Sequence, residues 1–504
     1  MIGLQEQAPT QNRSGLRRYV DLPNFSALTK HNIQTLFVMC VALSAALRLL
    51  QLGAQNFWFD EVETLRYAYD LFPVRDIHPP TYYGLIHLVL LFGNSEFWVR
   101  MPSLLMGVAS VAMVYYVGRL LFEPRITLIA TLLAAISPIL VWHSQDARMY
   151  SQFLLACLIT VFFYLQIIRQ GKTIYWVGYL FGALFAAYTQ LYAAFLVIAL
   201  SCHLLLFYRP LLLRWITFQF LLLLGYVPWL IIFFNLPPEQ IGGVRPKTLV
   251  TFPYTYYAFT NGYSLGPTIR ELRDFSLSVL IPYLPIIIPI ALVVTLLAVF
   301  GLRSLWRSSR DQCSFIVLWA VLPVLMAVMV PIIVRSMTYN VRYVIFSVPP
   351  FLYILAQGVV FLRRYYIGVV LLLIVVVFNS WSLYNNYFDA RYAKEDVRGA
   401  AQFVAANASP DDHVLVITVD HIFEWYFHQA NPVMSNSSSE SARSLVDEAI
   451  AGAHTLWLVE SRVWQSDPNN EIRKLLDNQY SLISKNEFSG VTLYRYCILD
   501  CSSS

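Results

Sequence analysis

Apolar runs of about twenty residues recur along most of this chain, and they restrict its fold more than any other feature of the sequence. A run of that length can cross the hydrocarbon layer of a bilayer as an α-helix. The chain is 58% hydrophobic and only 13% charged, whereas about a quarter of the residues in a typical soluble domain are charged. We therefore predict an α-helical polytopic membrane protein and exclude collagen-like, disordered and disulfide-scaffold classes. The candidate spans are 33–52, 101–122, 126–142, 151–168, 174–190, 193–208, 213–234, 276–301, 314–334, 343–362 and 366–383.

The basic residues predict how these spans are oriented. A shorter apolar piece, 82–93, could cross the membrane or lie in the interface as a juxtamembrane helix. If it crosses, three basic loops lie outside, against the tendency of short loops rich in Lys and Arg to stay in the cytoplasm; if it lies in the interface, all three lie inside. These loops contain Arg119 and Arg125, Arg169 and Lys172, and Arg209 and Arg214. The charges thus predict about eleven transmembrane helices, a cytoplasmic N-terminus followed by a first span that acts as a signal anchor, and a C-terminus outside the cytosol. The expected location is the plasma (inner) membrane.

The domain organisation follows from the same pattern. Residues 1–388 form the predicted transmembrane domain, with a first outer loop at 53–100 and a long outer loop at 235–275. Residues 389–504 form a predicted small extracytoplasmic α/β domain, to which we assign no chemistry because it lacks a Gly-rich phosphate loop. Its predicted strands are 413–419, 455–459, 480–485 and 490–496, and its predicted helices are 395–407 and 470–477. Near its end, Cys497 and Cys501 are either a strained disulfide or two free thiols.

The first outer loop contains two adjacent carboxylates, Asp60 and Glu61. They follow Trp58 and Phe59 just past the first span, at the depth where aromatic side chains settle at a membrane surface. One interpretation is a solvated helix start that Asp60 caps. The other is catalytic, because apolar neighbours raise the pKa of a carboxylate toward the range in which it accepts a proton from a hydroxyl nucleophile. The residues alone favour neither interpretation.

Further polar groups lie on the outer segments. His78, which precedes paired prolines and Tyr82, is either a hydrogen-bonded structural residue or a group that holds an acceptor or a metal. Asp146 and Arg148 form a polar corner between two spans. They either neutralise each other, or place Arg148 on a phosphate and Asp146 on a sugar hydroxyl or a cation.

Two more segments carry basic residues suited to a phosphate. Arg342 begins the helix of span 343–362, where backbone N–H groups also favour an anion. Arg335 is expected to reach lipid headgroups instead. The glycines and basic residues around Lys247 suit either a segment that closes over a phosphorylated ligand or a plain connector.

Taken in order, the motifs of these segments resemble those of a known superfamily. They are Arg48, Trp58-Phe59-Asp60-Glu61, His78-Pro79-Pro80-Thr81-Tyr82-Tyr83, Phe92-Gly93, Arg100-Met101-Pro102-Ser103, Gln145-Asp146-Ala147-Arg148-Met149-Tyr150 and Arg342-Tyr343. The set is similar to the bacterial branch of the C-class polytopic glycosyltransferases, which include the protein O-mannosyltransferases and the lipid A aminoarabinose transferases. The resemblance covers the first half of the membrane region well and the second half loosely.

The resemblance implies an inverting transfer of a sugar from a polyprenyl-phosphate donor to a lipid, glycan or protein acceptor at the outer face of the membrane. It implies that Asp60 is the catalytic carboxylate and that Glu61 assists it. The residues it implies for binding the substrate and the donor phosphate are His78, Tyr82, Arg100, Asp146, Arg148, Tyr150, Lys247 and Arg342. A lipid-linked donor also accounts for the missing nucleotide-binding signature.

Departures from the family pattern leave the acceptor and the cofactor open. The chain lacks the β-rich domain that eukaryotic protein mannosyltransferases insert between late spans, which makes a protein acceptor less secure. It has no second Asp-x-Asp on the outer face, so we assign no metal ligands and leave a divalent cation as an open alternative. A net charge of only +5 gives no reason to expect nucleic acid, whereas membrane lipids are expected partners.

Two other classes of protein would share this composition. One is a flippase or other transporter of lipid-linked sugars, and the other is a non-catalytic subunit of an envelope-glycan assembly machine. Transporters place ionisable groups near the bilayer midplane, whereas here only Arg48 lies well inside a predicted span. The pattern therefore favours the transferase.

Overall fold

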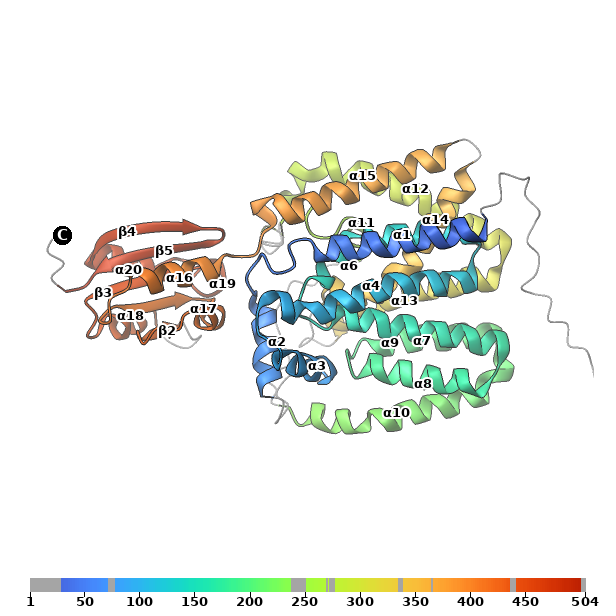
Figure 1. Ribbon diagram of the computed structural model, residues 1–504, viewed down its shortest axis with the longest axis horizontal. Helices are drawn as coiled ribbons and strands as arrows, with labels where there is room; N and C mark the ends of the chain where they lie inside the picture. Colours follow the sequence, from blue (N-terminus) through green and yellow to red (C-terminus); the bar gives the residue numbers. More distant parts are fainter. Residues whose placement is uncertain are drawn as a thin grey trace, which may run out of the picture.

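The structure is a computed structural model that describes residues 29–70, 78–236, 251–268, 271, 277–333, 339–363, 366–435 and 441–499. Figure 1 shows two parts: a bundle of long helices that run side by side, and a small sheet domain beyond one end of the bundle. We call this end the domain-side end; it carries α2 (Phe59–Tyr69) and α3 (Thr81–Leu90). The opposite end, where α7 (Tyr150–Gln170) ends and α13 (Arg310–Ile333) begins, is called the far end.

A helix occupies each of the predicted spans. The helices of the bundle are α1 (Lys30–Leu49), α4 (Glu96–Leu121), α5 (Pro124–Ala135), α6 (Pro138–Ser144), α7 (Tyr150–Gln170), α8 (Thr173–Ala187), α9 (Ala193–Phe207), α10 (Leu212–Phe234), α12 (Leu284–Ser308), α13 (Arg310–Ile333), α14 (Val348–Leu362) and α15 (Ile367–Phe388). The apolar runs therefore located the helices correctly, because a backbone in lipid must satisfy its hydrogen bonds within the segment.

The number of membrane crossings depends on which helices are long enough to span a bilayer. Among the described residues, eight helices are long and apolar enough to cross a membrane, and a ninth span is counted if α5 and α6, which are bent by 54°, form one crossing. The apolar helices α8 and α9 have 15 residues each, short of the usual length of about twenty. A mostly helical chain with about eight candidate spans is confirmed. The predicted eleven spans require α8 and α9 to cross as well, and stay a prediction.

The break between α5 and α6 is held by a buried arginine. Pro138 begins α6 and has no N–H, so the last carbonyls of α5 lose helical partners. Arg48 of α1 donates to the carbonyl oxygen of Ala135 at 3.1 Å and to Ser144 Oγ at 3.0 Å. A Cβ added to Gly107 of α4 would lie 2.1 Å from Ser144 Oγ, so only glycine lets α4 pass this closely. Arg48 thus stabilises the turn that directs α6 to the domain-side end.

The sequence predicted a loop at 235–275, but part of this segment is helical. Within it, α11 (Thr251–Asn261) packs against α6, α13 and α15. The helix forms because its aromatic residues find apolar partners: Tyr256 and Phe259 both contact the ring of Phe351. Lys247 lies outside the described residues.

The C-terminal domain contains a five-stranded sheet in the order β2-β1-β3-β5-β4. Its central strands, β1 (His413–Ile417) and β3 (Thr455–Glu460), are parallel and buried on both faces by helices. The predicted elements are confirmed as β1, β3, β4 (Ser481–Phe488), β5 (Val491–Cys497), α16 (Val397–Asn407) and α20 (Glu471–Gln479). The sequence missed the shorter β2 (Val433–Ser435), α17 (Asp420–Tyr426), α18 (Ala442–Ile450) and α19 (Val463–Ser466). Cys497 is disulfide-bonded, and Cys501 lies outside the described residues.

Candidate active site

Asp60 and Glu61 lie in the first turn of α2, at the domain-side end of the bundle. The carboxylate of Glu61 turns back and accepts a hydrogen bond from the backbone N–H of Trp58, the residue before the helix, at 3.2 Å. The interpretation in which Asp60 caps α2 is therefore wrong, because Glu61 performs that role. Asp60 lies one residue earlier, which leaves its carboxylate free to face a different set of side chains.

Glu61 is fully buried, and its two carboxylate oxygens accept five hydrogen bonds. Two come from the guanidinium of Arg100 at 2.8 Å, one from the backbone N–H of Ala147 at 2.8 Å and one from Lys394 Nζ at 3.0 Å, in addition to that from Trp58. Burial disfavours the charged form, but Arg100 and then Lys394 outweigh it and hold the pKa of Glu61 below its usual range. A carboxylate has about four lone-pair positions, so that of Glu61 is fully engaged within the protein.

Arg100 of α4 is engaged in the same way. Besides Glu61, its guanidinium donates to the carbonyl oxygens of Leu52 and Gln55 at 2.8 Å and of Asn56 at 2.9 Å. The side chain is buried, and these contacts fix the loop that leads into α2. These contacts engage all three nitrogens of the guanidinium, and the phosphate contact that the resemblance implied stays a prediction.

Asp60 has a more open environment than Glu61. Its side chain is 19% exposed, and among the described residues only Arg342 donates to its carboxylate. Arg342 belongs to the 3-10 helix η6 (Val341–Ser347), and its guanidinium lies 5.0 Å from the ring centre of Tyr150 and 5.8 Å from that of Trp58. Aromatic faces attract a cation, so the two rings hold Arg342 beside Asp60.

These neighbours lower the pKa of Asp60. Burial disfavours the carboxylate, but Arg342 and then Arg148 stabilise it more strongly, so the pKa of Asp60 lies below its usual range. The expectation that apolar neighbours raise this pKa is wrong. That expectation rested on the residues next to Asp60 in the sequence. The fold places two guanidinium groups from distant segments, Arg342 and Arg148, close to its carboxylate.

The polar corner between α6 and α7 does not pair with itself. Asp146 is buried and its Oδ1 lies 2.9 Å from Lys394 Nζ, while Arg148 donates to the backbone carbonyl of Asp60 at 3.1 Å and to Thr64 Oγ1 at 2.9 Å. The interpretation in which Asp146 and Arg148 neutralise each other is therefore wrong. Burial opposes ionisation of Asp146, but the positive charge of Lys394 outweighs this effect. The pKa of Asp146 therefore lies below its usual range. We call this set the Asp60 network; its members are Asp60, Glu61, Arg100, Asp146, Arg148, Arg342 and Lys394.

Several buried polar atoms beside Asp60 lack hydrogen-bond partners. Within the described part of the chain, these include Nε of Arg342, Nε1 of Trp58 and the hydroxyl of Tyr150. An unpaired buried polar group costs about 1–3 kcal/mol, so proteins rarely leave several together without a use for them. Because each can donate and all lie around one guanidinium, an anionic ligand with several oxygens would satisfy them.

The remaining predicted residues differ in their positions. Tyr82 is buried, and its hydroxyl lies 2.7 Å from Ser103 Oγ. Ser103 in turn donates to the backbone carbonyl of Arg148 at 3.1 Å, so Tyr82 contacts the corner through Ser103. His78 is half-buried just before α3, and the described contacts do not join it to Asp60. As noted, Lys247 is outside the described residues.

Lys394 is the member of the network that sequence reasoning missed. It lies in the connection between α15 and α16, 248 residues after Asp146 and 333 after Glu61. The only signal for it was its position just beyond the last apolar run, because no motif surrounds it.

The described residues contain no group of three or more His, Cys, Asp and Glu side chains placed to hold a metal ion. The carboxylates of Asp60, Glu61 and Asp146 face Arg and Lys side chains instead. We therefore assign no metal ligands to the network.

Comparisons with known proteins agree with the motif resemblance. Residues 77–235 match the family described as dolichyl-phosphate-mannose-protein mannosyltransferase. No curated protein has a significant sequence match to the chain. The apo structure of ArnT from Cupriavidus metallidurans is similar with a TM-score of 0.62 at 13% identity, over 92% of this chain and 98% of that one.

An archaeal enzyme has the same fold. The apo oligosaccharyltransferase of Archaeoglobus fulgidus matches with a TM-score of 0.52 at 13% identity, over 88% of this chain and 71% of that one. A structure of the Archaeoglobus fulgidus oligosaccharyltransferase AglB with an inhibitory peptide and a dolichol-phosphate matches with a TM-score of 0.51 at 12% identity, over 93% and 74%. At such low identity the structures show a common fold. Together with the family match, this fold confirms that the chain resembles the C-class polytopic glycosyltransferases, as its motifs predicted.

Proposed function

We propose that this protein is an inverting glycosyltransferase that moves a sugar from a polyprenyl-phosphate donor to an acceptor hydroxyl at the outer face of the membrane. The observation that carries the proposal is Asp60, a partly exposed carboxylate beside Arg342 and a set of unpartnered buried donors. A lipid-linked donor is supported by the family that matches residues 77–235, which is named for dolichyl-phosphate-mannose, and by the dolichol-phosphate in the AglB structure.

In the proposed reaction Asp60 is the general base. Its carboxylate removes the proton of the acceptor hydroxyl while the acceptor oxygen bonds to the anomeric carbon of the sugar. The bond from that carbon to the phosphate oxygen breaks on the opposite face, which inverts the configuration. The leaving polyprenyl phosphate keeps the bonding electrons, and Arg342 stabilises the charge that develops on it.

The ion pair between Arg342 and Asp60 has a consequence for this mechanism. While Arg342 donates to Asp60, the carboxylate is a weaker base. A donor phosphate next to Arg342 competes for the guanidinium, which forms strong charge-assisted hydrogen bonds with phosphate oxygens. Donor binding would therefore draw Arg342 away from Asp60 and raise the basicity of the carboxylate when it is needed.

Glu61 and Arg100 act differently in this proposal. Their hydrogen bonds to each other and to the backbone of the loop leave them no free group that faces a substrate. We therefore propose that both residues position α2, and that Asp60 alone of the two adjacent carboxylates takes part in proton transfer.

The proposed orientation has the far end of the bundle in the cytosol and the C-terminal domain outside. The basic loops gather at the far end, where Arg169 donates to the carbonyl of Leu120 and Arg214 donates to Thr173 Oγ1 at 2.9 Å. Glu487 on β4, 69% exposed, offers a test. Its replacement by cysteine should react with a membrane-impermeant maleimide in intact cells; protection would reverse the orientation.

The function is tested with purified protein in lipid vesicles. Undecaprenyl-phosphate carrying a radiolabelled sugar is supplied together with cell-envelope extract, and both the transfer of label and its movement across the bilayer are measured. We expect transfer that Asp60→Asn lowers at least about 100-fold while binding of the donor is kept. Label that crosses the bilayer without transfer would identify a flippase, and transfer that is unchanged in Asp60→Asn would exclude Asp60 as the base.

A further inference from the structure

Lys394 brings a charge from the edge of the C-terminal domain into the Asp60 network. Its ammonium lies 3.0 Å from Glu61 Oε2 and 2.9 Å from Asp146 Oδ1, and its side chain is only 12% exposed. Its backbone N–H donates to Gln55 Oε1 at 3.2 Å. The side chain thus joins a buried carboxylate of α2 to one in the corner between α6 and α7.

The segment around Lys394 is held rigidly on the domain. The next residue, Glu395, receives two hydrogen bonds of 2.8 Å from the guanidinium of Arg462. Asp396 follows and caps α16 by accepting from the N–H of Gly399 at 2.9 Å. The position of the ammonium therefore depends on the position of the whole domain.

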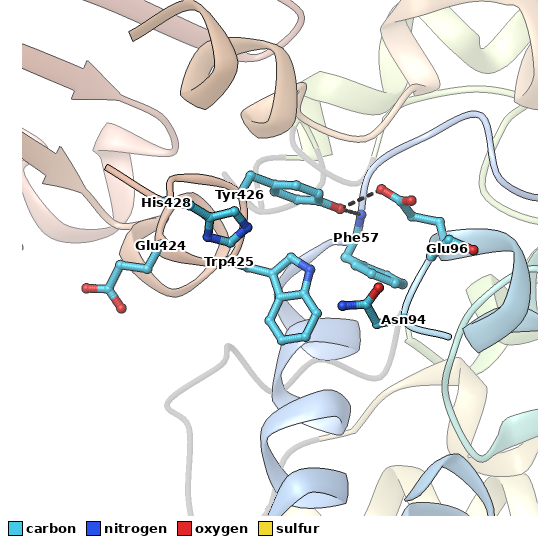
Figure 2. Close-up of a pocket in the computed structure, with 8 residues that line it drawn as sticks. Phe57, Asn94, Glu96, Glu424, Trp425, Tyr426 and His428 are labelled. Atoms are coloured by element: carbon cyan, nitrogen blue, oxygen red, sulfur yellow. Dashed lines mark hydrogen bonds between the residues drawn. The ribbon is translucent and has the colours of Figure 1, made fainter. Parts of the chain in front are cut away.

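The domain rests on the short loop that leads into α2. Figure 2 shows Tyr426 of α17, whose hydroxyl accepts from the N–H of Phe57 and donates to Glu96, both at 2.8 Å. Arg398 of α16 donates to the same glutamate at 2.8 Å and to the carbonyl of Ala54 at 2.7 Å. These contacts fall within six residues of Asp60 or at the start of α4, so the domain and the catalytic loop are fixed to each other.

We propose that Lys394 is a positioning residue for sugar transfer, through which the C-terminal domain completes the active site. The inference rests on the proposed function. Lys394 binds both Glu61 and Asp146. It thereby holds the first turn of α2 next to the corner at 145–149, and this fixes the position of Asp60 beside Arg342.

Electrostatics explains why a cation is needed there. Two buried carboxylates without a cation between them repel each other and lose their hydration. Without Lys394, Glu61 would still form a salt bridge with Arg100. Asp146 would lose the salt bridge that joins it to a lysine. The titratable and charged groups that interact with Asp146 are Lys394, His143 of α6, Glu61 and Asp60 of α2, Arg100 of α4 and Tyr82 of α3.

The test compares Lys394→Gln, Lys394→Arg and Lys474→Gln in the full-length protein in vesicles. Lys474, an exposed residue of α20 on the same domain, is the control for removing a lysine. We expect Lys394→Gln to lower kcat about 10- to 100-fold, the effect of a misplacement near 1 Å, with little change in the KM for the donor. We expect Lys394→Arg to recover most of the loss and Lys474→Gln to behave as wild type.

The pH profile separates positioning from a general loss of folding. Without Lys394 the pKa of Asp146 rises, because burial is then opposed only by weaker neighbours. The acid limb of kcat/KM should therefore move to higher pH in Lys394→Gln. An unchanged kcat and an unchanged acid limb would overturn the proposal.

A double variant tests the role of Lys394 even if Lys394→Gln folds poorly. If Lys394→Gln folds poorly, adding Asp146→Asn removes both charges and should recover folding and at least part of kcat. No recovery would overturn the proposed role.

Thermal unfolding measured at several pH values tests the same ion pairs without an activity assay. Wild type should lose stability as the pH falls below about 4, because its paired carboxylates have lowered pKa values. In Lys394→Gln this loss should be smaller, because the pKa of Asp146 is then less depressed and less of the stability depends on its ionisation. If wild type transfers no sugar, the proposed function fails, and the unfolding profiles still test whether Lys394 stabilises the two carboxylates.

Discussion

Two polar clusters lie at opposite ends of the helical bundle, and they differ in how completely their hydrogen bonds are satisfied. The far-end cluster consists of Tyr164, His203, Tyr208 and Asp311. His203 lies 2.8 Å from Asp311 Oδ1 and 2.7 Å from the hydroxyl of Tyr164, and Tyr208 donates to Asp311 Oδ2 at 2.6 Å. Every side-chain polar atom of this cluster has a partner.

The Asp60 network at the domain-side end has more charges and fewer satisfied atoms. Arg342 Nε and, beside it, the hydroxyl of Tyr150 are buried without a hydrogen-bond partner among the described residues. Asp146 Oδ2 has no hydrogen bond there either, and lies 3.7 Å from Nδ1 of His143. The far-end cluster joins α7, α9 and α13, and it needs nothing else. What separates the two clusters is therefore the incomplete pairing of hydrogen-bonding groups around Asp60, and this feature supports the proposed ligand site.

The largest expected effect separates the two aspartates. Asp60→Asn should lower the transfer rate about 10²- to 10⁴-fold, the usual contribution of a general base. This loss should persist when turnover is counted per folded molecule, although removing one partner of the Arg342 ion pair also lowers the melting temperature. Asp311→Asn should lower only the stability, because it weakens two hydrogen bonds at about 1–3 kcal/mol in total and touches no substrate. Turnover per folded molecule and thermal unfolding of both variants provide the measurement. A rate loss in Asp311→Asn that exceeds its loss of folded protein would break the comparison.

An intermediate effect is expected at Arg342. Arg342→Gln should lower kcat/KM about 100-fold, because it removes a cation from the leaving phosphate. It should also move the acid limb of kcat/KM to higher pH, because Arg342 lowers the pKa of Asp60 and a protonated Asp60 cannot accept a proton. Arg214→Gln at the far end is the matched control, and its profile should equal that of wild type. An acid limb that does not move in Arg342→Gln would mean that a group other than Asp60 controls it.

The sequence predicted the helices well and the pairing within the site poorly. The apolar runs identified every helix of the bundle, because burial in lipid is a local property of a twenty-residue window. Asp60, Arg148 and Arg342 were recognised as candidates from their residue types and positions. The ion pair of Asp60 with Arg342 joins residues 282 apart, and the charge partner of Asp146 is 248 residues away, so neither could be read from spacing.

The far-end cluster was missed for a related reason. His203 lies inside the apolar helix α9 and Asp311 in the polar first turn of α13, and neither belongs to a motif. A single polar residue of this kind gives no indication of its partner. Lys394 was missed because the domain that carries it had no recognisable chemistry of its own. In both cases the information lay in the packing of distant segments, which depends on tertiary structure.

The smallest expected effect, and the closest comparison, is between two tyrosines of α7. Tyr150→Phe removes a hydroxyl that has no partner among the described residues, so stability should be unchanged or slightly higher, while the transfer rate falls about threefold to tenfold if that hydroxyl binds the donor phosphate. Tyr164→Phe removes a hydroxyl bonded to His203, so it should destabilise the protein by about 1 kcal/mol and leave turnover unchanged. Both changes delete one oxygen from the same helix, which makes size and hydrophobicity equal. If Tyr150→Phe lost stability and kept its rate, the unpartnered atoms at the domain-side end would be structural, and the difference between the two clusters would no longer point to a ligand.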